Sequence, residues 1–129
     1  MEKIIRKYFE AWIEKDLSVI KETFSENIIY SECYGPEYRG INQVIQWFKD
    51  WNLKGNVLEW TIYKCIHIDN IVIVEWYFKC DYENKISAFN GVTIAEFEEK
   101  NKIYSLREYE SKAEHHYPYT ILNGNAKKQ

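Results

Sequence analysis

The sequence predicts an α+β fold in which helices come first and a curved, mostly antiparallel sheet follows. Apolar residues recur with a helical period of 3.6 in the first part of the chain and with a strand period of two after residue 56. Short polar links rich in Asn and Asp separate the alternating segments, as in a meander of hairpins. We therefore expect one domain over residues 1–129, with three N-terminal helices packed on the sheet.

The three helices are predicted from apolar stripes. In the first fifteen residues, Tyr8, Phe9 and Trp12 belong to one stripe, which predicts an amphipathic helix. Asp16 is suited to cap a second short helix, and a third stripe covers residues 41–51. We expect the first helix to lie across the concave face of the sheet and to bury Tyr8, Phe9 and Trp12.

The strands are predicted from alternation. A short β-rich run at residues 28–33 follows a break at 25–27 and precedes a loop with turn residues at both ends. Four longer strands are expected at residues 58–68, 71–81, 85–98 and 103–110. The last residues, 120–129, are polar and are interpreted as a tail.

Composition excludes several classes of function. The net charge of −3 argues against a general binder of nucleic acid or of anionic membranes, because such binders carry an excess of basic residues. No apolar run approaches the ~20 residues of a membrane span, and no secretory signal is recognisable at the N-terminus. The three cysteines form no C-x-x-C pair. We expect reduced thiols and a cytoplasmic location.

Three stretches, taken in order, resemble a known family. They are GPEYRGINQVIQWF, then IVIVEWYF, then FNGVTIAEF followed by KIYSLREYES. The order of elements over residues 3–112 is similar to that of the nuclear transport factor 2-like superfamily, in its SnoaL-like branch. The resemblance implies a cone-like α+β barrel, with the sheet wrapped around the long first helix and a pocket between them. It also implies that the chain dimerises through the outer face of the sheet.

The resemblance extends to candidate site residues. Limonene-epoxide hydrolases of this superfamily have a cavity-facing acid where this chain has Glu108, and hold a water where it has Tyr30 and Glu32. Alternation then predicts the remaining wall of the pocket. With Trp12 of the first helix, the expected ligand-binding residues are Leu58, Trp60, Trp76, Phe78, Ser87, Phe89 and Leu106. The Arg-Asp pair of those hydrolases is replaced by Trp76 and Phe78, which argues against their mechanism here.

A carboxyl group in an aromatic pocket loses hydration, so its pKa rises and it can transfer protons near neutral pH. We assign this role to Glu108, with Tyr30 and Glu32 orienting a water or a substrate oxygen. The alternative for each glutamate is an inert hydrogen bond to a Tyr, a Trp N–H or Arg39.

Three functions stay open. The first is an isomerase, cyclase or hydratase acting on a small apolar or polycyclic molecule, such as a polyketide, steroid or terpenoid. The second is a non-catalytic binding module, and the third is a protein-interaction domain with a filled core. None of them requires a cofactor or a metal. His115 and His116 are adjacent and lack a spaced third ligand, so we expect them to be exposed.

The outward-facing positions of the predicted sheet are also apolar. Ile73, Tyr77, Val92, Ile94 and Tyr109 lie on this face by alternation. A monomer rarely exposes so much contiguous apolar surface. We predict a homodimer through this face; the alternative is that residues 117–122 cover it.

Overall fold

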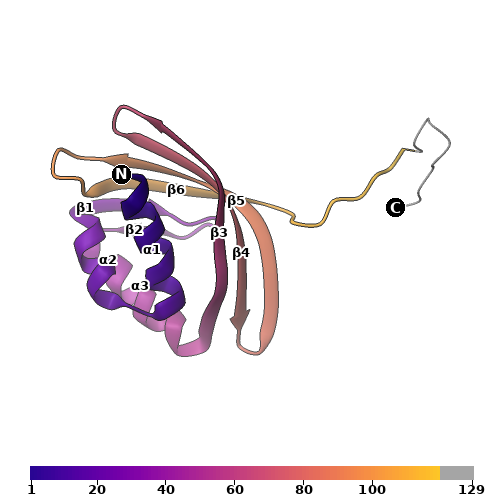
Figure 1. Cartoon of the computed structure of the whole chain (residues 1–129). Helices are drawn as coiled ribbons and strands as arrows, with labels where there is room; N and C mark the ends of the chain where they lie inside the picture. Colours follow the sequence, from indigo (N-terminus) through magenta and orange to yellow (C-terminus); the bar gives the residue numbers. More distant parts are fainter. Residues whose placement is uncertain (120–129) are drawn as a thin grey trace.

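The computed structural model describes residues 1–119, and the predicted tail at 120–129 lies outside them. Three helices precede most of the sheet (Figure 1). In chain order the elements are α1 (Glu2–Glu14), α2 (Leu17–Thr23), β1 (Phe24–Ser31), β2 (Glu37–Arg39), α3 (Ile41–Lys54), β3 (Gly55–Ile68), β4 (Ile71–Tyr82), β5 (Lys85–Phe97) and β6 (Ile103–Ser111).

The strands form a single six-stranded sheet in the order β2-β1-β6-β5-β4-β3. Strands β3 to β6 are a meander of antiparallel neighbours, and β1 pairs with β6 in parallel. The long strands curve around the helices, which lie on the concave side (Figure 1). The predicted α+β cone, with three helices on a strongly curved and mostly antiparallel sheet, is confirmed.

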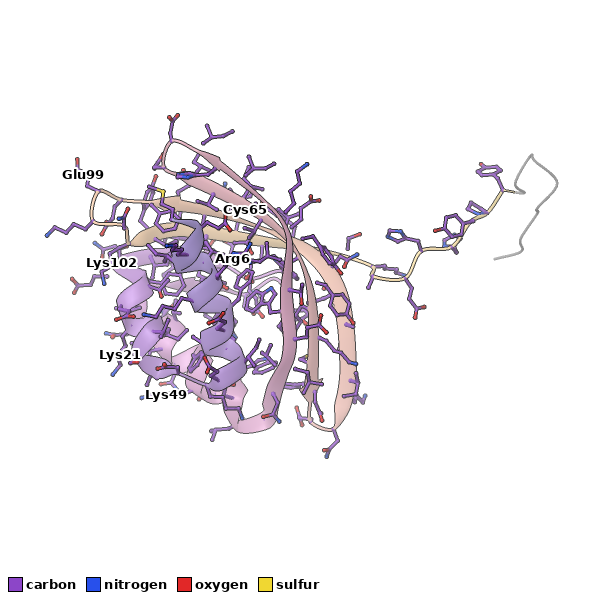
Figure 2. The ribbon with its side chains drawn as sticks, viewed as in Figure 1. Arg6, Lys21, Lys49, Cys65, Glu99 and Lys102 are labelled. Atoms are coloured by element: carbon purple, nitrogen blue, oxygen red, sulfur yellow. The ribbon has the colours of Figure 1, made fainter. Side chains whose placement is uncertain are left out.

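Helix α1 crosses the concave face as expected. Its side chains Tyr8, Phe9 and Trp12 are all buried. Phe9 stacks flat on Trp60 of β3, with ring centroids 3.8 Å apart. Charged side chains such as Lys21 of α2 and Lys49 of α3 point away from the sheet (Figure 2). The amphipathic pattern that predicts the helices therefore also fixes how they pack.

The entry into the sheet differs from the prediction. Asp16 caps α2, since its Oδ1 accepts a hydrogen bond of 3.1 Å from the backbone N–H of Ser18. However, β1 begins directly after α2, at Phe24, and residues 25–27 are not a break. The pairing of β1 with β6 is irregular between Phe24 and Ile29, so the strand accommodates the polar residues there.

A bulge in β3 makes one prediction wrong. Val57 pairs with Cys80 and Glu59 with Lys79, so Leu58 is an extra residue in the strand. The bulge shifts the alternation by one position, and Leu58 is 48 % exposed instead of facing the pocket. Beyond it Trp60 pairs with Phe78 on the concave side, so the alternation that predicts Trp60 holds.

After β6 the chain extends away from the domain (Figure 1). Tyr117 and Tyr119 are both exposed, so residues 117–119 do not cover the outer face of the sheet. The remainder of the alternative cover, residues 120–122, lies outside the described residues. No helix within residues 1–119 has the length and the apolar character that a membrane span requires.

Candidate functional site

An aromatic chamber lies between the helices and the concave face of the sheet. Twelve side chains line it, of which nine are aromatic, two are glutamates and one is a cysteine: Trp12, Tyr30, Glu32, Cys33, Tyr34, Trp47, Trp51, Trp60, Trp76, Phe78, Phe89 and Glu108. All five tryptophans of the chain are among them. The free volume of the chamber is about 40 Å³, which corresponds to roughly three water molecules.

A larger hollow, the vestibule, adjoins the chamber. Its volume is about 450 Å³ and its wall is more polar: Glu32, Tyr34, Tyr38, Trp47, Asp50, Trp51, Lys54, Cys80, Tyr82 and Ser87. Four residues line both spaces, and we call them the neck: Glu32, Tyr34, Trp47 and Trp51. The neck is therefore the boundary between the small apolar chamber and the open vestibule.

A hydrogen-bonded chain of two tyrosine hydroxyls and one glutamate carboxyl ends in the chamber. Tyr30 of β1 donates a hydrogen bond of 2.7 Å to Oε2 of Glu108. The hydroxyls of Tyr8 and Tyr30 are 2.6 Å apart, and both residues are buried. Glu108 is only 7 % exposed, and its place opposite Thr93 of β5 directs it to the concave side. The two phenols thus fix the position of the Glu108 carboxyl.

Burial determines the acidity of this group. Loss of hydration raises the pKa of Glu108 to about 8, the Tyr30 hydrogen bond lowers it in part, and the negative charge of Glu32 raises it further. Burial and then the Glu108 charge raise the pKa values of Tyr8 and Tyr30 well above 10.0. Both phenols therefore remain protonated at neutral pH and keep a proton to donate.

Glu32 is the second carboxyl, and it stands in the neck. A tight turn after β1 positions it: its carbonyl accepts from the N–H of Gly35, whose φ of +111° suits glycine. Tyr38 donates a hydrogen bond of 3.1 Å to its Oε1. Burial raises the pKa of Glu32 to about 7, and the Tyr38 bond opposes that shift. Glu32 therefore changes charge near neutral pH.

No cation balances these two acids within the chamber. The twelve lining residues include no Lys, Arg or His. Arg39 is near in sequence, but it pairs with Glu37 at 2.8 Å on the surface. The predicted alternative in which Arg39 holds a glutamate is therefore wrong, whereas Tyr hydrogen bonds to both glutamates are present.

The tryptophan indoles differ in how their N–H groups are used. Nε1 of Trp76 donates to Thr93 Oγ1 at 2.8 Å. The ring has space because Gly91 lies opposite it, where a Cβ would come within 2.2 Å of the indole. Nε1 of Trp12 and Nε1 of Trp60 are buried and have no hydrogen-bond partner among residues 1–119. Both residues line the chamber with their rings, but these two nitrogen atoms are themselves inaccessible from its free volume.

The structure brings most of the predicted site residues together. Glu108, Glu32 and Tyr30 line the chamber, as do Trp12, Trp60, Trp76, Phe78 and Phe89. Ser87 lines the vestibule instead. Leu106 is buried in the core but does not line the chamber, and Leu58 lies outside because of the bulge.

Sequence reasoning missed four lining residues: Cys33, Tyr34, Trp47 and Trp51. The first two lie in the turn after β1, where strand alternation has no meaning. The two tryptophans lie on α3, spaced four residues apart and therefore on one face of the helix. That spacing is the signal that could have placed them.

Metal ligation has no support in the described part of the chain. Residues 1–119 contain no cluster of three or more His, Cys, Asp or Glu side chains placed to hold an ion. His115 and His116 are exposed in the segment after β6.

Comparison with known proteins places the fold. The SnoaL-like domain family matches residues 5–106. The chain belongs to this family. Among solved structures, this SnoaL-like domain is similar to a hypothetical protein of ketosteroid isomerase-like fold from Catenulispora acidiphila, in complex with trimethylamine, with a TM-score of 0.74, 18 % identity and 85 % of each chain covered.

Two further structures of the same fold bear names of enzymes. An LEH-like epoxide hydrolase from M. tuberculosis has a TM-score of 0.76 and 13 % identity, with 84 % of this chain and 80 % of that chain covered. A candidate SnoaL-like polyketide cyclase from Shewanella denitrificans has a TM-score of 0.69 and 16 % identity, with 85 % and 89 % covered. No curated protein sequence matches the chain. At these identities the likeness to solved structures concerns the fold alone.

Proposed function

We propose that this SnoaL-like domain binds a small organic molecule and that Glu108 transfers a proton within it, as in an isomerase, cyclase or hydratase. The observation that carries the proposal is the Glu108 carboxyl: buried, held by Tyr30, facing an aromatic chamber and unbalanced by any cation in the chamber wall. A carboxyl with a pKa near the working pH can act both as acid and as base. The names of the epoxide hydrolase and cyclase structures support such chemistry on this fold.

The roles follow from the contacts. Tyr30 donates to Oε2 of Glu108, and no donor within residues 1–119 is bonded to its other oxygen. That oxygen would take a proton from a substrate carbon or return it.

The volumes of the chamber and the vestibule suggest which part of a substrate each would hold. A chamber of about 40 Å³ is smaller than the ~150 Å³ cavity that holds a benzene ring. It would therefore take only the reacting end of an apolar or polycyclic molecule. The body would lie in the vestibule of about 450 Å³. The trimethylamine in the Catenulispora protein supports a small organic ligand in a domain of this fold.

The second candidate is a binding or protein-interaction module without catalysis. It is favoured by the extent to which the cone's own rings fill it: Trp60 packs against Phe9 at 3.8 Å and against Trp76 at 5.5 Å. In that case the glutamates only satisfy hydrogen bonds from Tyr30 and Tyr38.

Proton exchange into a simple ketone separates the two candidates. We would incubate cyclohexanone in D₂O with the protein and follow loss of the α-protons by NMR. The enzyme reading predicts accelerated exchange and a fall of roughly 10²–10⁴-fold in Glu108→Gln. Glu96→Gln, a matched change on the outer face, should leave the rate unchanged. Equal rates in wild type and Glu108→Gln would favour the binding module.

We also propose a homodimer through the outer face of the sheet. The supporting observation is that the apolar positions Ile73, Tyr77, Val92 and Ile94 are only partly buried and Tyr109 is exposed in the single chain. Light scattering at micromolar concentration should give twice the chain mass of 15.6 kDa. A species of 15.6 kDa alone would refute the dimer.

We propose a cytoplasmic location as well. Cys33, Cys65 and Cys80 are all free thiols, as expected in a reducing compartment. Cell fractionation with an antibody to the protein would check it, and recovery from an extracellular or oxidising fraction would contradict it.

A further inference from the structure

The neck combines aromatic rings with one carboxyl group. Tyr34 is 55 % exposed, and Trp47 and Trp51 are partly exposed, so their rings can be reached from the vestibule. The rings come from two elements, the turn after β1 and helix α3, and all three line the vestibule. Aromatic faces carry partial negative charge, and several of them around one point attract alkylammonium cations.

The charges around the neck point the same way. The titratable groups that line the chamber and the vestibule with Glu32 are Tyr30, Cys33, Tyr34, Tyr38, Asp50, Lys54, Cys80, Tyr82 and Glu108. Of these only Lys54 is a cation, and within residues 1–119 it forms no ion pair with Glu32 or Asp50. The chamber and the vestibule are therefore lined by more carboxyl groups than cationic side chains, and a bound cation could balance the excess negative charge.

We propose that the neck binds the ammonium group of an alkylamine or quaternary ammonium compound, with its three aromatic side chains contacting the alkyl groups and Glu32 balancing the charge. The inference rests on the proposed small-molecule binding and names the chemical class of the ligand. It leaves Glu108, which lines only the chamber, free for proton transfer on the part of the ligand that enters the chamber.

Binding of a permanent cation must be linked to the protonation of Glu32. Its pKa of about 7 means that much of it is neutral at neutral pH. A cation beside it favours the carboxylate, so binding expels a proton into solvent. The affinity for the cation should therefore rise from pH 6 to pH 8, whereas the affinity for a neutral ligand of the same shape should not.

Choline and 3,3-dimethylbutan-1-ol are suitable probes, because they share one shape and differ in the charge of the central atom. Binding to the full chain would be measured by calorimetry and by tryptophan fluorescence at pH 6 and pH 8. We expect choline to bind about tenfold or more tightly than the alcohol at pH 8. We expect Glu32→Gln to remove most of that preference, and Trp51→Leu to weaken choline binding.

Two controls keep the outcomes separate. Glu99→Gln removes an exposed carboxyl in the turn between β5 and β6 (Figure 2) and should keep the full preference. Glu10→Gln removes an exposed carboxyl of α1, which lines neither space, and should also keep it. If the alcohol binds as tightly as choline, or if the preference survives in Glu32→Gln, the inference is wrong while small-molecule binding stands. If neither probe binds, the inference is also overturned, and the ketone exchange assay still decides the proposed function.

Discussion

Glu108 and Glu96 lie on neighbouring strands of one sheet, but on opposite faces. Glu96, on the outer face, is partly exposed and accepts a bond of 3.2 Å from Arg107. Glu108, on the concave face, is buried, and its recorded hydrogen-bond partner is the neutral hydroxyl of Tyr30. Strand alternation therefore gives the same residue type two different chemistries. One carboxyl is paired with a guanidinium on the outer face, and the other is buried with no cation among the residues that line its chamber.

The largest expected effect concerns stability against pH. Burial raises the pKa of Glu108 from 4.5 to about 8, so the folded protein holds a proton that the unfolded chain releases. The contribution of this carboxyl to the free energy of unfolding is complete below pH 4.5 and is lost as the pH rises towards 8. The loss is on the order of 4 kcal/mol in the free energy of unfolding. Urea unfolding between pH 5 and pH 9 measures it.

Matched variants sharpen this result. Glu108→Gln should remove a large part of the decline, because the amide does not titrate, and the decline that remains belongs to Glu32, whose pKa is also raised, to about 7. Glu96→Gln should keep the whole decline. If the decline is the same in Glu108→Gln as in wild type, another group is responsible for it. Burial on the concave face would then not raise the pKa of Glu108 as described.

The next effect concerns packing on the concave face. Gly91→Ala places a methyl group against the Trp76 indole, where a Cβ would be 2.2 Å away. The ring must shift, and we expect a loss of about 1–3 kcal/mol in the free energy of unfolding. Asn90→Ala, the neighbouring position with opposite orientation, should stay within about 0.5 kcal/mol. Thermal or urea unfolding compares the two, and equal losses would contradict the assigned packing.

The smallest effect concerns the hydrogen bond that holds Glu108. Tyr30→Phe removes that donor and should cost about 1 kcal/mol at pH 6, where the carboxyl is mostly protonated. It should also raise the pKa of Glu108 further, since the Tyr30 bond lowers it. Tyr109→Phe on the outer face should change the stability by less than about 0.5 kcal/mol. Similar effects for the two tyrosines would argue against a special role for Tyr30.

The sequence could predict the fold because each element depends on local periodicity. The switch in period near residue 56 corresponds to the start of β3 at Gly55, and the four long strands lie within a few residues of the expected ranges. The burial of Tyr8, Phe9 and Trp12 follows from one helical stripe. Such patterns survive folding because tertiary packing uses the same faces.

The site could be predicted only where strand alternation is regular. Trp76 and Phe89 were placed correctly because β4 and β5 pair without interruption along their length. Leu58 was misplaced because a bulge depends on pairing with β4 and leaves no clear sign in the sequence of one strand. Tyr34 and Trp47 were missed because a turn and a helix, not a strand, bring them to the chamber.

The most direct test of the account is the titration of the Glu108 carboxyl itself. Carbon-13 NMR of protein labelled at the glutamate side chains would follow each carboxyl from pH 3 to pH 10, and the signal absent in Glu108→Gln would identify this one. We predict a midpoint of about 8. A midpoint near 4.5, the ordinary value, would mean that Glu108 is charged at neutral pH and would contradict the proton-transfer role.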